Sequence, residues 1–209
     1  MVREVKGDLC AARENIIAHQ VNCKGVMGAG VAKQIKKKLL SDADFKTYVG
    51  LCKNDAETLL GRNHWCVHST KRYIVNMFGE DNPTGTGLDT NYEALERCLK
   101  LLATRAAERK LSIALPGYLG CGLAGGDWNI VYEMIEKVSA QENVDITLYY
   151  IMDSILLLWK EFGSVPMNPE TECIEEEWHG FAAGTFREDI WKWFEDTFQL
   201  SIATDLMNI

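Results

Sequence analysis

The sequence predicts an α/β domain in which helices cover a largely parallel or mixed sheet. Segments with apolar residues at every second position, or with continuous apolar runs, alternate with segments of helical period. The candidate strands are short and apolar throughout, which is typical of strands that are buried on both faces. The chain has 209 residues, of which 47% are hydrophobic, so it is long enough to bury one sizeable core.

Six strands and four helices are expected in the first 152 residues. The expected strands are Val2–Lys6, Ile16–Val21, His64–His68, Arg72–Met77, Ser112–Leu115 and Val144–Ile151. The expected helices are Gly28–Leu40, Asp42–Asn54, Thr90–Arg109 and Trp128–Ala140. Thr90 and Glu93 have the spacing of a capping box, which would begin the third helix. Asp127 is expected to cap the fourth helix.

The composition changes near Met152, which divides the chain into a domain of residues 1–152 and an extension of residues 153–209. Residues 151–209 carry 12 acidic and 3 basic side chains, and they contain four of the six tryptophans. Thr185 and Glu188 form another expected capping box, for a helix that continues to Phe198. Because so many aromatic side chains are not expected to stay in water, the extension is predicted to pack on the domain or on a protein partner.

Several classes of protein are not expected. No apolar run approaches the roughly 18 residues of a membrane span, and the first ten residues lack the apolar core of a signal peptide. The seven cysteines are scattered, without a CxxC pair or a spacing typical of zinc ligands, which predicts reduced thiols and no metal. The acidic extension would repel nucleic acid. We therefore expect a cytoplasmic protein that binds neither membranes nor nucleic acid.

Two glycine-rich segments each follow a buried strand and precede a helix. The first glycine loop, residues 22–30, contains Gly25, Gly28 and Gly30, which can adopt positive φ and expose backbone N–H groups. With the positive end of the following helix, these groups predict an anion site. Taken alone, the segment could equally be a tight turn between a strand and a helix.

The second glycine loop, residues 116–127, holds five glycines within ten residues. Ordering so many glycines costs more conformational entropy than a turn requires, so a role beyond stability is expected. Two such loops at the carboxyl ends of strands are typical of an open α/β sheet that binds a diphosphate. Together they are a much stronger indication of a binding site than either loop alone.

Three motifs in this order resemble the macrodomain family. They are Gly7-Asp8-Leu9, the segment Asn22-Cys-Lys-Gly-Val-Met-Gly-Ala-Gly-Val-Ala32, and Gly120-Cys-Gly-Leu-Ala124. The resemblance covers about residues 1–152 and is best with the branch of ADP-ribosyl-processing proteins and ADP-ribose 1''-phosphate phosphatases. It implies a three-layer α/β/α fold with a central mixed sheet, ADP-ribose or a derivative as the ligand, and no cofactor.

The resemblance also assigns roles to individual residues. Asp8 would accept a hydrogen bond from the adenine amino group, and Tyr149 or Tyr150 would lie against the adenine ring. The first loop would surround the distal ribose, with Asn22 near its hydroxyls, and the second loop would hold the diphosphate. The ligand-binding residues so implied are Asp8, Leu9, Asn22, Gly25, Val26, Met27, Gly28, Gly30, Val31, Leu119, Gly120, Cys121, Gly122, Leu123, Ala124, Tyr149 and Tyr150.

The candidate catalytic residues are His19, Asn22 and Asp127. His19 matches a histidine of the phosphatase-like branch and could act as a nucleophile or general acid, or it could be a buried strand residue. The lysine that some relatives use is absent from residues 76–80, and Ala124 stands where some have aspartate.

Three functions remain open from sequence. The first is a hydrolase acting at the distal ribose, on ADP-ribose 1''-phosphate or an ADP-ribosyl linkage. The second is a reader that binds ADP-ribose without turnover, and the third is an interaction protein directed by its extension. The sequence also leaves open whether Glu80 or Asp127 reaches the ligand.

Overall fold

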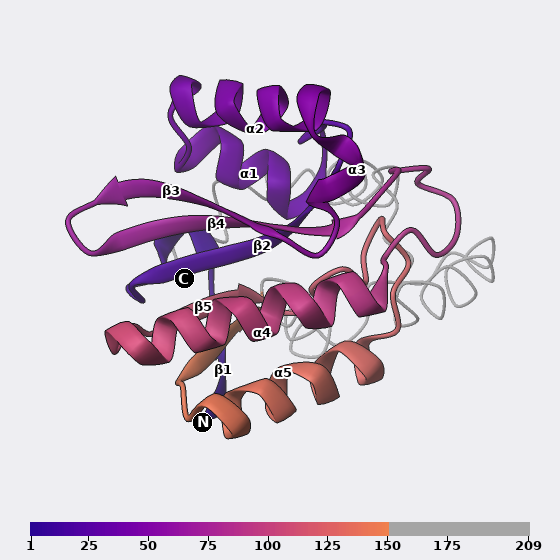
Figure 1. Cartoon of the computed structure of the whole chain (residues 1–209). Coiled ribbons are helices and arrows are strands. Elements are labelled where there is room, and N and C mark those ends of the chain that lie inside the picture. Colours follow the sequence, from indigo (N-terminus) through magenta and orange to yellow (C-terminus); the bar gives the residue numbers. More distant parts are fainter. Residues whose placement is uncertain (151–209) are drawn as a thin grey trace, which may run out of the picture.

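The computed structural model describes residues 1–150, which form a six-stranded sheet with helices on both faces (Figure 1). The elements are β1 (Val2–Lys6), the 3₁₀ helix η1 (Leu9–Ala11), β2 (Ile16–Asn22), α1 (Gly30–Lys38), α2 (Asp42–Asn54), α3 (Ala56–Leu59), β3 (Asn63–Ser69), β4 (Arg72–Glu80), α4 (Tyr92–Arg109), β5 (Ile113–Pro116), α5 (Trp128–Glu142) and β6 (Ile146–Tyr150). The predicted extension, with its tryptophans and its second capping box, lies outside the described residues.

The strand order is β1-β6-β5-β2-β4-β3, and β3 is antiparallel to β4 while the other pairs are parallel. The expectation of a mixed sheet is therefore confirmed. Because parallel strands point the same way, the carboxyl ends of β5, β2 and β4 lie side by side at one edge. The loops that follow these three strands meet there, although they are far apart in the sequence.

Helices α1 and α2 cover one face of the sheet, and α4 and α5 cover the other, which gives three layers (Figure 1). Alternate residues of each strand pack in the hydrophobic clusters on the two faces of the sheet, because successive side chains point to opposite faces. Met77 of β4 packs in the cluster that contains Leu99 of α4, whereas Ile74 packs in the cluster that contains Ile35 of α1. Each such side chain contributes about 1.5–3 kcal/mol by its burial.

The starts of two helices differ from the predictions. Helix α1 begins at Gly30 instead of Gly28. Helix α4 begins at Tyr92, and its cap is Asn91, whose Oδ1 accepts the N–H of Ala94 at 2.9 Å. The predicted capping box of Thr90 and Glu93 is therefore wrong. The elements η1 and α3 were not predicted, because three or four residues are too few to show a helical period.

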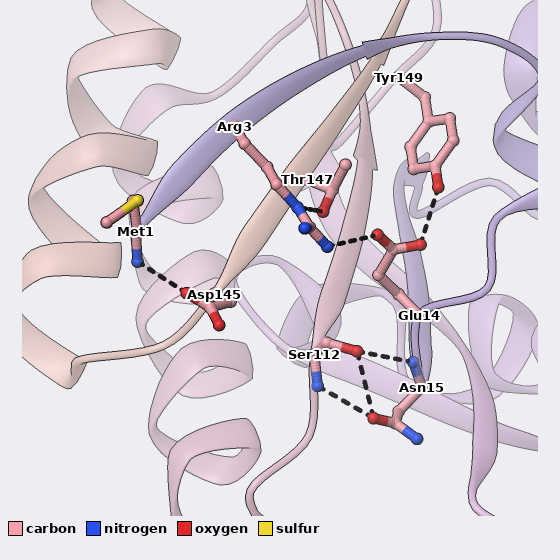
Figure 2. A network of polar contacts seen from close by, with 8 residues as sticks. All are labelled: Met1, Arg3, Glu14, Asn15, Ser112, Asp145, Thr147 and Tyr149. Atoms are coloured by element: carbon pink, nitrogen blue, oxygen red, sulfur yellow. Dashed lines mark hydrogen bonds and ion pairs between the residues drawn. The ribbon is translucent and has the colours of Figure 1, made fainter.

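A network of polar contacts ties β1 and β6 to the segment before β2 (Figure 2). The Arg3 guanidinium donates to Thr147 at 2.9 Å and forms an ion pair with Glu14 at 3.5 Å, while the Tyr149 hydroxyl donates to Glu14 at 2.9 Å. Burial alone would raise the pKa of the Glu14 carboxyl, but hydrogen bonds from Thr147 and Tyr149 and the charge of Arg3 hold it below its usual value. The network thus compensates a nearly buried carboxylate at the edge of the sheet.

Within residues 1–150, no helix combines the length and the apolar character that a membrane span requires. The six cysteines of this part are free thiols, and Cys173 lies outside it. No group of three His, Cys, Asp or Glu side chains in the described part of the chain is placed to hold a metal ion.

Candidate functional site

The side chain of Asn22 holds the first glycine loop in shape. Its Nδ2 donates to the Val26 carbonyl at 2.8 Å, and its Oδ1 accepts the N–H groups of Lys24 and Val26 at 3.1 Å each. The Tyr48 hydroxyl of α2 donates to the Asn22 carbonyl at 2.8 Å. Asn22 is nearly buried, and its carboxamide is used within the loop. The structure therefore gives Asn22 a positioning role, and direct contact with a ligand stays a prediction.

The rest of the first glycine loop leads into α1. Gly25 and Gly30 have positive φ, at 78° and 55°, whereas Gly28 does not. The cap residue of α1 is Ala29, whose side chain makes no capping hydrogen bond, so the first N–H groups of the helix are suited to an anion. The two exposed apolar side chains on this loop and helix are Val26 and Val31, while Met27 is buried in the core. A contact from Met27 to a ligand would therefore come from its backbone.

The second glycine loop is fixed through the carbonyl of Gly120. This oxygen accepts the Thr90 hydroxyl at 2.5 Å and the N–H of Gly126 at 3.0 Å. Gln20 of β2 donates from Nε2 to the Thr90 oxygen at 3.0 Å, which connects the loop to the neighbouring strand. Gly120 has a φ of 70°, a conformation that favours glycine. The loop is thus held from β2 and from Thr90, which precedes α4.

The other predicted residues of the second loop divide by exposure. Leu119, Cys121 and Ala124 are buried, and Leu123 is exposed. Gly122 lies between these extremes. Burial raises the pKa of the Cys121 thiol to about 12, helped by the nearby charge of Asp127, so the thiol is not ionised at neutral pH. Any contact of Cys121 with a ligand would therefore involve its backbone or a neutral thiol.

Glu80, at the end of β4, lies between the two loops. Its carbonyl accepts the N–H of Cys23 in the first loop at 2.9 Å, and its backbone forms a β-bridge with Thr90. Burial and then the charge of Asp89 raise the pKa of its carboxyl to about 7, against a smaller opposite effect of a hydrogen bond with Gln20. The Glu80 carboxyl is thus held closer to its protonated form than an exposed glutamate is.

Asp8 lies after β1 and caps η1. Its Oδ1 accepts the N–H of Cys10 at 2.8 Å, and its Oδ2 forms an ion pair with Lys38 of α1 at 2.9 Å. Leu9 is buried beneath it. The carboxylate retains some exposure to solvent, so it can still accept a further hydrogen bond.

The two tyrosines of β6 point to opposite faces of the sheet. Tyr149 packs against the cluster that contains Leu9, on the side of α1. Tyr150 packs on the other face, against Tyr118 and Trp128, with ring centroids 5.6 and 6.2 Å away. Of the two, Tyr149 shares its face with the residues near Asp8, which favours it as the partner of an adenine ring.

The structure places His19 inside the domain. Its Nε2 is 2.8 Å from Oδ1 of Asn76, and the Asn76 amide donates to Nδ1 of His64 at 3.1 Å. These three residues are direct neighbours across β2, β4 and β3. The His19 ring is 1% exposed, and burial lowers its pKa to about 4 against the opposite effect of Asn76. This neutral, enclosed ring fits the alternative of a buried strand residue, and a catalytic role for it stays a prediction.

Asp127 caps α5, as the sequence predicts. Its Oδ1 accepts the N–H of Asn129 at 2.8 Å, and its own N–H donates to the Tyr92 hydroxyl at 2.7 Å. The residue is exposed, so its carboxylate is accessible from solvent.

Neither Gln20 nor Thr90 is predicted from the sequence as a residue of the site. Gln20 is one of three polar residues in β2, with His19 and Asn22, and a polar side chain in a largely buried strand is the signal that could reveal it. Thr90 has the local spacing of a helix cap, whereas its partner, Gly120, lies 30 residues further along the chain, so no local pattern reveals the contact.

The fold and these two loops define a three-layer α/β/α domain with glycine-rich turns at one edge of its sheet. The profile of the Macro domain family matches residues 18–135. The chain belongs to the macrodomain family, which confirms the resemblance seen in the sequence.

Relatives with assigned names support this membership. The chain is 33% identical over 156 residues to a DNA ADP-ribosyl glycohydrolase of Thermus aquaticus, a match of 71% of this chain and 41% of that protein. It is 31% identical over 153 residues to the human ADP-ribose glycohydrolase OARD1, with 69% of this chain and 88% of the relative covered. It is also 27% identical to an ADP-ribose 1''-phosphate phosphatase of Meyerozyma guilliermondii, over 70% of this chain and 97% of that one.

Among solved structures, the macrodomain of Mycobacterium tuberculosis DarG superposes with a TM-score of 0.62. It is 27% identical, and the match covers 71% of this chain and 97% of that domain. The α/β class and the mixed sheet predicted for the first part of the chain are therefore confirmed.

Proposed function

We propose that residues 1–152 bind ADP-ribose at the edge of the sheet where the two glycine loops meet, and that they hydrolyse a bond at its distal ribose. That bond is an ADP-ribosyl linkage or the ester of ADP-ribose 1''-phosphate. The observation that carries the proposal is that hydrogen bonds hold both glycine loops in place at the ends of β2 and β5. Family membership and relatives that are named as ADP-ribose hydrolases support it.

In this proposal, the second glycine loop and the start of α1 supply N–H donors for the diphosphate, which cost little to organise because the loops are already held. The first loop surrounds the distal ribose. Asp8 accepts a hydrogen bond from the adenine amino group, and the ring of Tyr149 packs against the adenine. His19 is given no bond-making step, because its ring is enclosed and neutral.

Binding is tested by calorimetric titration of the full chain with ADP-ribose. Asp8→Ala should weaken the binding of ADP-ribose by about tenfold, which corresponds to the loss of one hydrogen bond to a charged group. The same substitution should change the affinity for ribose 5-phosphate little, because that probe has no adenine. Asp42→Ala, an exposed aspartate in α2, serves as the matched control. Absence of any heat with ADP-ribose would contradict the proposal.

A reader without turnover is the second candidate, and the burial of His19 and the lack of lysine in residues 76–80 favour it. The two candidates separate when the purified chain is incubated with ADP-ribose 1''-phosphate and with ADP-ribosylated peptide and DNA. Release of phosphate or ADP-ribose identifies a hydrolase. Tight binding of ADP-ribose with all three substrates intact identifies a reader.

We also propose that residues 153–209 form a separate unit that packs on the domain or binds a protein partner. Truncation after Met152 tests this division of the chain. A truncated chain that stays in solution and binds ADP-ribose normally supports it, whereas loss of ADP-ribose binding would show that the extension is part of the site.

A further inference from the structure

Carbonyl groups of the second glycine loop accept hydrogen bonds from within the domain. In the segment 120–124, these are the carbonyls of Gly120, Gly122 and Ala124. The Gly120 carbonyl accepts the N–H of Gly126 at 3.0 Å, and the Ala124 carbonyl accepts the N–H of Thr90 at 2.9 Å. These acceptors are therefore satisfied before a ligand binds.

Several N–H groups of the same loop have no such partners. Those of Leu119, Gly120, Gly122, Leu123 and Ala124 donate to no acceptor within residues 1–150. Backbone N–H groups that are gathered in one loop without internal acceptors suit an anion. In the described part of the chain, the loop thus combines satisfied carbonyls with N–H groups that can still donate, which is the arrangement that a diphosphate requires.

Thr90 holds both ends of this segment. Its hydroxyl donates to the Gly120 carbonyl at 2.5 Å, and its backbone N–H donates to the Ala124 carbonyl at 2.9 Å. Thr90 is buried, and its own backbone is fixed by the β-bridge to Glu80 at the end of β4. One residue at the end of the sheet therefore sets the position of the first and the last carbonyl of the segment.

The amide of Gln20 sets the direction of the Thr90 hydroxyl. A hydroxyl has one proton to donate, and Thr90 uses it on the Gly120 carbonyl, so Gln20 presents its NH₂ group to the Thr90 oxygen at 3.0 Å. With the donor of Gln20 on one side, the hydroxyl proton remains directed to Gly120. The hydroxyl is thus an acceptor from β2 and a donor to the loop.

The seat of this amide costs stability. Its Oε1 is buried and finds no donor among residues 1–150, and a buried acceptor without a donor is destabilising. A Cβ on Gly79 or Gly120 would lie 2.8 or 2.5 Å from this oxygen, so both glycines are needed to make room for it. An apolar side chain would avoid the orphaned oxygen, and the presence of glutamine therefore favours a role beyond stability.

We propose that Thr90 and Gln20 are positioning residues for the recognition of the diphosphate. They hold the segment 120–124 so that its N–H groups face the anion, and neither side chain contacts the ligand. The inference rests on the proposed function and deepens it, because it names the residues that prepare the second glycine loop. It also predicts a selective effect: loss of the Thr90 hydroxyl weakens ligands that carry the diphosphate and spares ligands that lack it.

The test compares four forms of the full chain: the parent, Thr90→Val, Thr90→Ser and Thr104→Val. Valine has the shape of threonine without the hydroxyl, and serine restores the hydroxyl. Thr104 lies on α4, where its hydroxyl donates to the Lys100 carbonyl at 2.9 Å, so Thr104→Val is a matched control away from the loops. ADP-ribose is titrated by calorimetry, and adenosine, which has no phosphate, is titrated by NMR.

We expect Thr90→Val to bind ADP-ribose about tenfold or more weakly, with adenosine affinity within about threefold of the parent chain. Thr90→Ser and Thr104→Val should both stay within about threefold of the parent chain on ADP-ribose. The inference is overturned if Thr90→Val keeps its ADP-ribose affinity, if it loses affinity for adenosine equally, or if Thr90→Ser is as weak as Thr90→Val.

A double-mutant cycle tests the part of Gln20. Gln20→Met, which has a similar size and no donor, should weaken ADP-ribose binding about fivefold in the parent chain and less than about twofold in Thr90→Val, because Gln20 acts through the Thr90 hydroxyl. Equal effects in the two backgrounds would contradict the inference. If Thr90→Val does not fold, Gln20→Met carries the same contrast between ADP-ribose and adenosine. A parent chain that does not bind ADP-ribose would contradict the proposed function itself.

Discussion

The carboxamide of Asn22 closes the first glycine loop on Val26, donating to its carbonyl at 2.8 Å and accepting its N–H at 3.1 Å. One side chain thereby fixes the backbone of a segment that contains Gly25 and would otherwise be free to move. The loop is ordered before a ligand arrives, so its ordering does not reduce the affinity.

Replacing Asn22 by alanine should therefore affect both stability and binding. The variant removes three hydrogen bonds to partly buried backbone groups of the loop, so we expect the free energy of unfolding to fall by about 2 kcal/mol. The affinity for ADP-ribose should fall by about tenfold, because the loop must then be ordered on binding. Urea denaturation and calorimetry measure the two effects. Asn129→Ala, an exposed residue of α5, should change neither, and unchanged affinity in Asn22→Ala would contradict the positioning role.

Two glycines with nearly the same positive φ should respond differently to alanine. Gly120 and Gly85 have φ of 70° and 69°, but a Cβ on Gly120 would meet Gln20 Oε1 at 2.5 Å and Thr90 Oγ1 at 3.0 Å, while a Cβ on Gly85 has no atom within 4 Å. The Gln20 amide cannot move away without losing its bond to Thr90. We expect Gly85→Ala to cost about 1 kcal/mol of stability from strain alone, and Gly120→Ala about 3 kcal/mol.

The Gly120 variant should also bind ADP-ribose at least about tenfold more weakly, because its loop is displaced. Thermal and chemical denaturation together with calorimetry check this pair. Equal effects of the two substitutions would mean that the contact with Gln20 does not hold the second loop.

The burial of His19 predicts a pH dependence of stability. Its pKa is about 4 in the folded chain and about 6.5 when exposed, so the unfolded chain holds more protons between these values. Stability should therefore fall as the pH is lowered from 6.5 towards 4, by on the order of 3 kcal/mol from this residue. His19→Gln cannot take up the proton, so the stability difference between parent and variant should shrink by most of this amount at pH 4.

His68→Gln provides the control for that experiment, because His68 is exposed. Its stability should follow the parent chain through the same pH range. If the difference between the parent chain and His19→Gln were the same at pH 4 and pH 7.5, His19 would not be buried in its neutral form.

Glu80 predicts the opposite pH dependence. Its folded pKa of about 7 lies above the ordinary value of 4.5, so the stabilising protonated form is fully present below pH 4.5 and is lost as the pH rises through 7. Glu80→Gln stays neutral, so its free energy of unfolding should rise relative to that of the parent chain over this pH range. Because the side chain is partly exposed, we expect a gain of about 1 kcal/mol at pH 8 instead of the full linkage value. Urea denaturation at pH 5 and pH 8 measures it, and a gain that is equal at both values would argue against the raised pKa.

Much of the fold was predictable because the signals are local. The strand Val2–Lys6 and the helix Asp42–Asn54 have the predicted bounds, since apolar runs and helical periods are contained within each segment. The start of α4 was not predictable, because Thr90 matches a capping box locally but bonds to Gly120 across the site. A contact between distant segments overrides the local pattern there.

The candidate site was predictable to a lesser extent. Glycine loops at strand ends are visible in the sequence, whereas the surroundings of one side chain depend on the sheet. His19 looks the same in sequence whether it is exposed or buried, and its partner Asn76 is set by the register of β2 and β4. The pKa of Glu80 depends on Gln20 and Asp89, which come together only when the strands are assembled.

Strand β6 runs parallel to β2 and β5, so it ends at Tyr150 on the same edge of the sheet as both glycine loops. The described part of the chain therefore ends on the side where the ligand is expected, not on the opposite side. A partner that binds to residues 151–209 would therefore be tethered to that edge. The encounter of the bound partner with the site would then be intramolecular, so its frequency would not depend on the protein concentration.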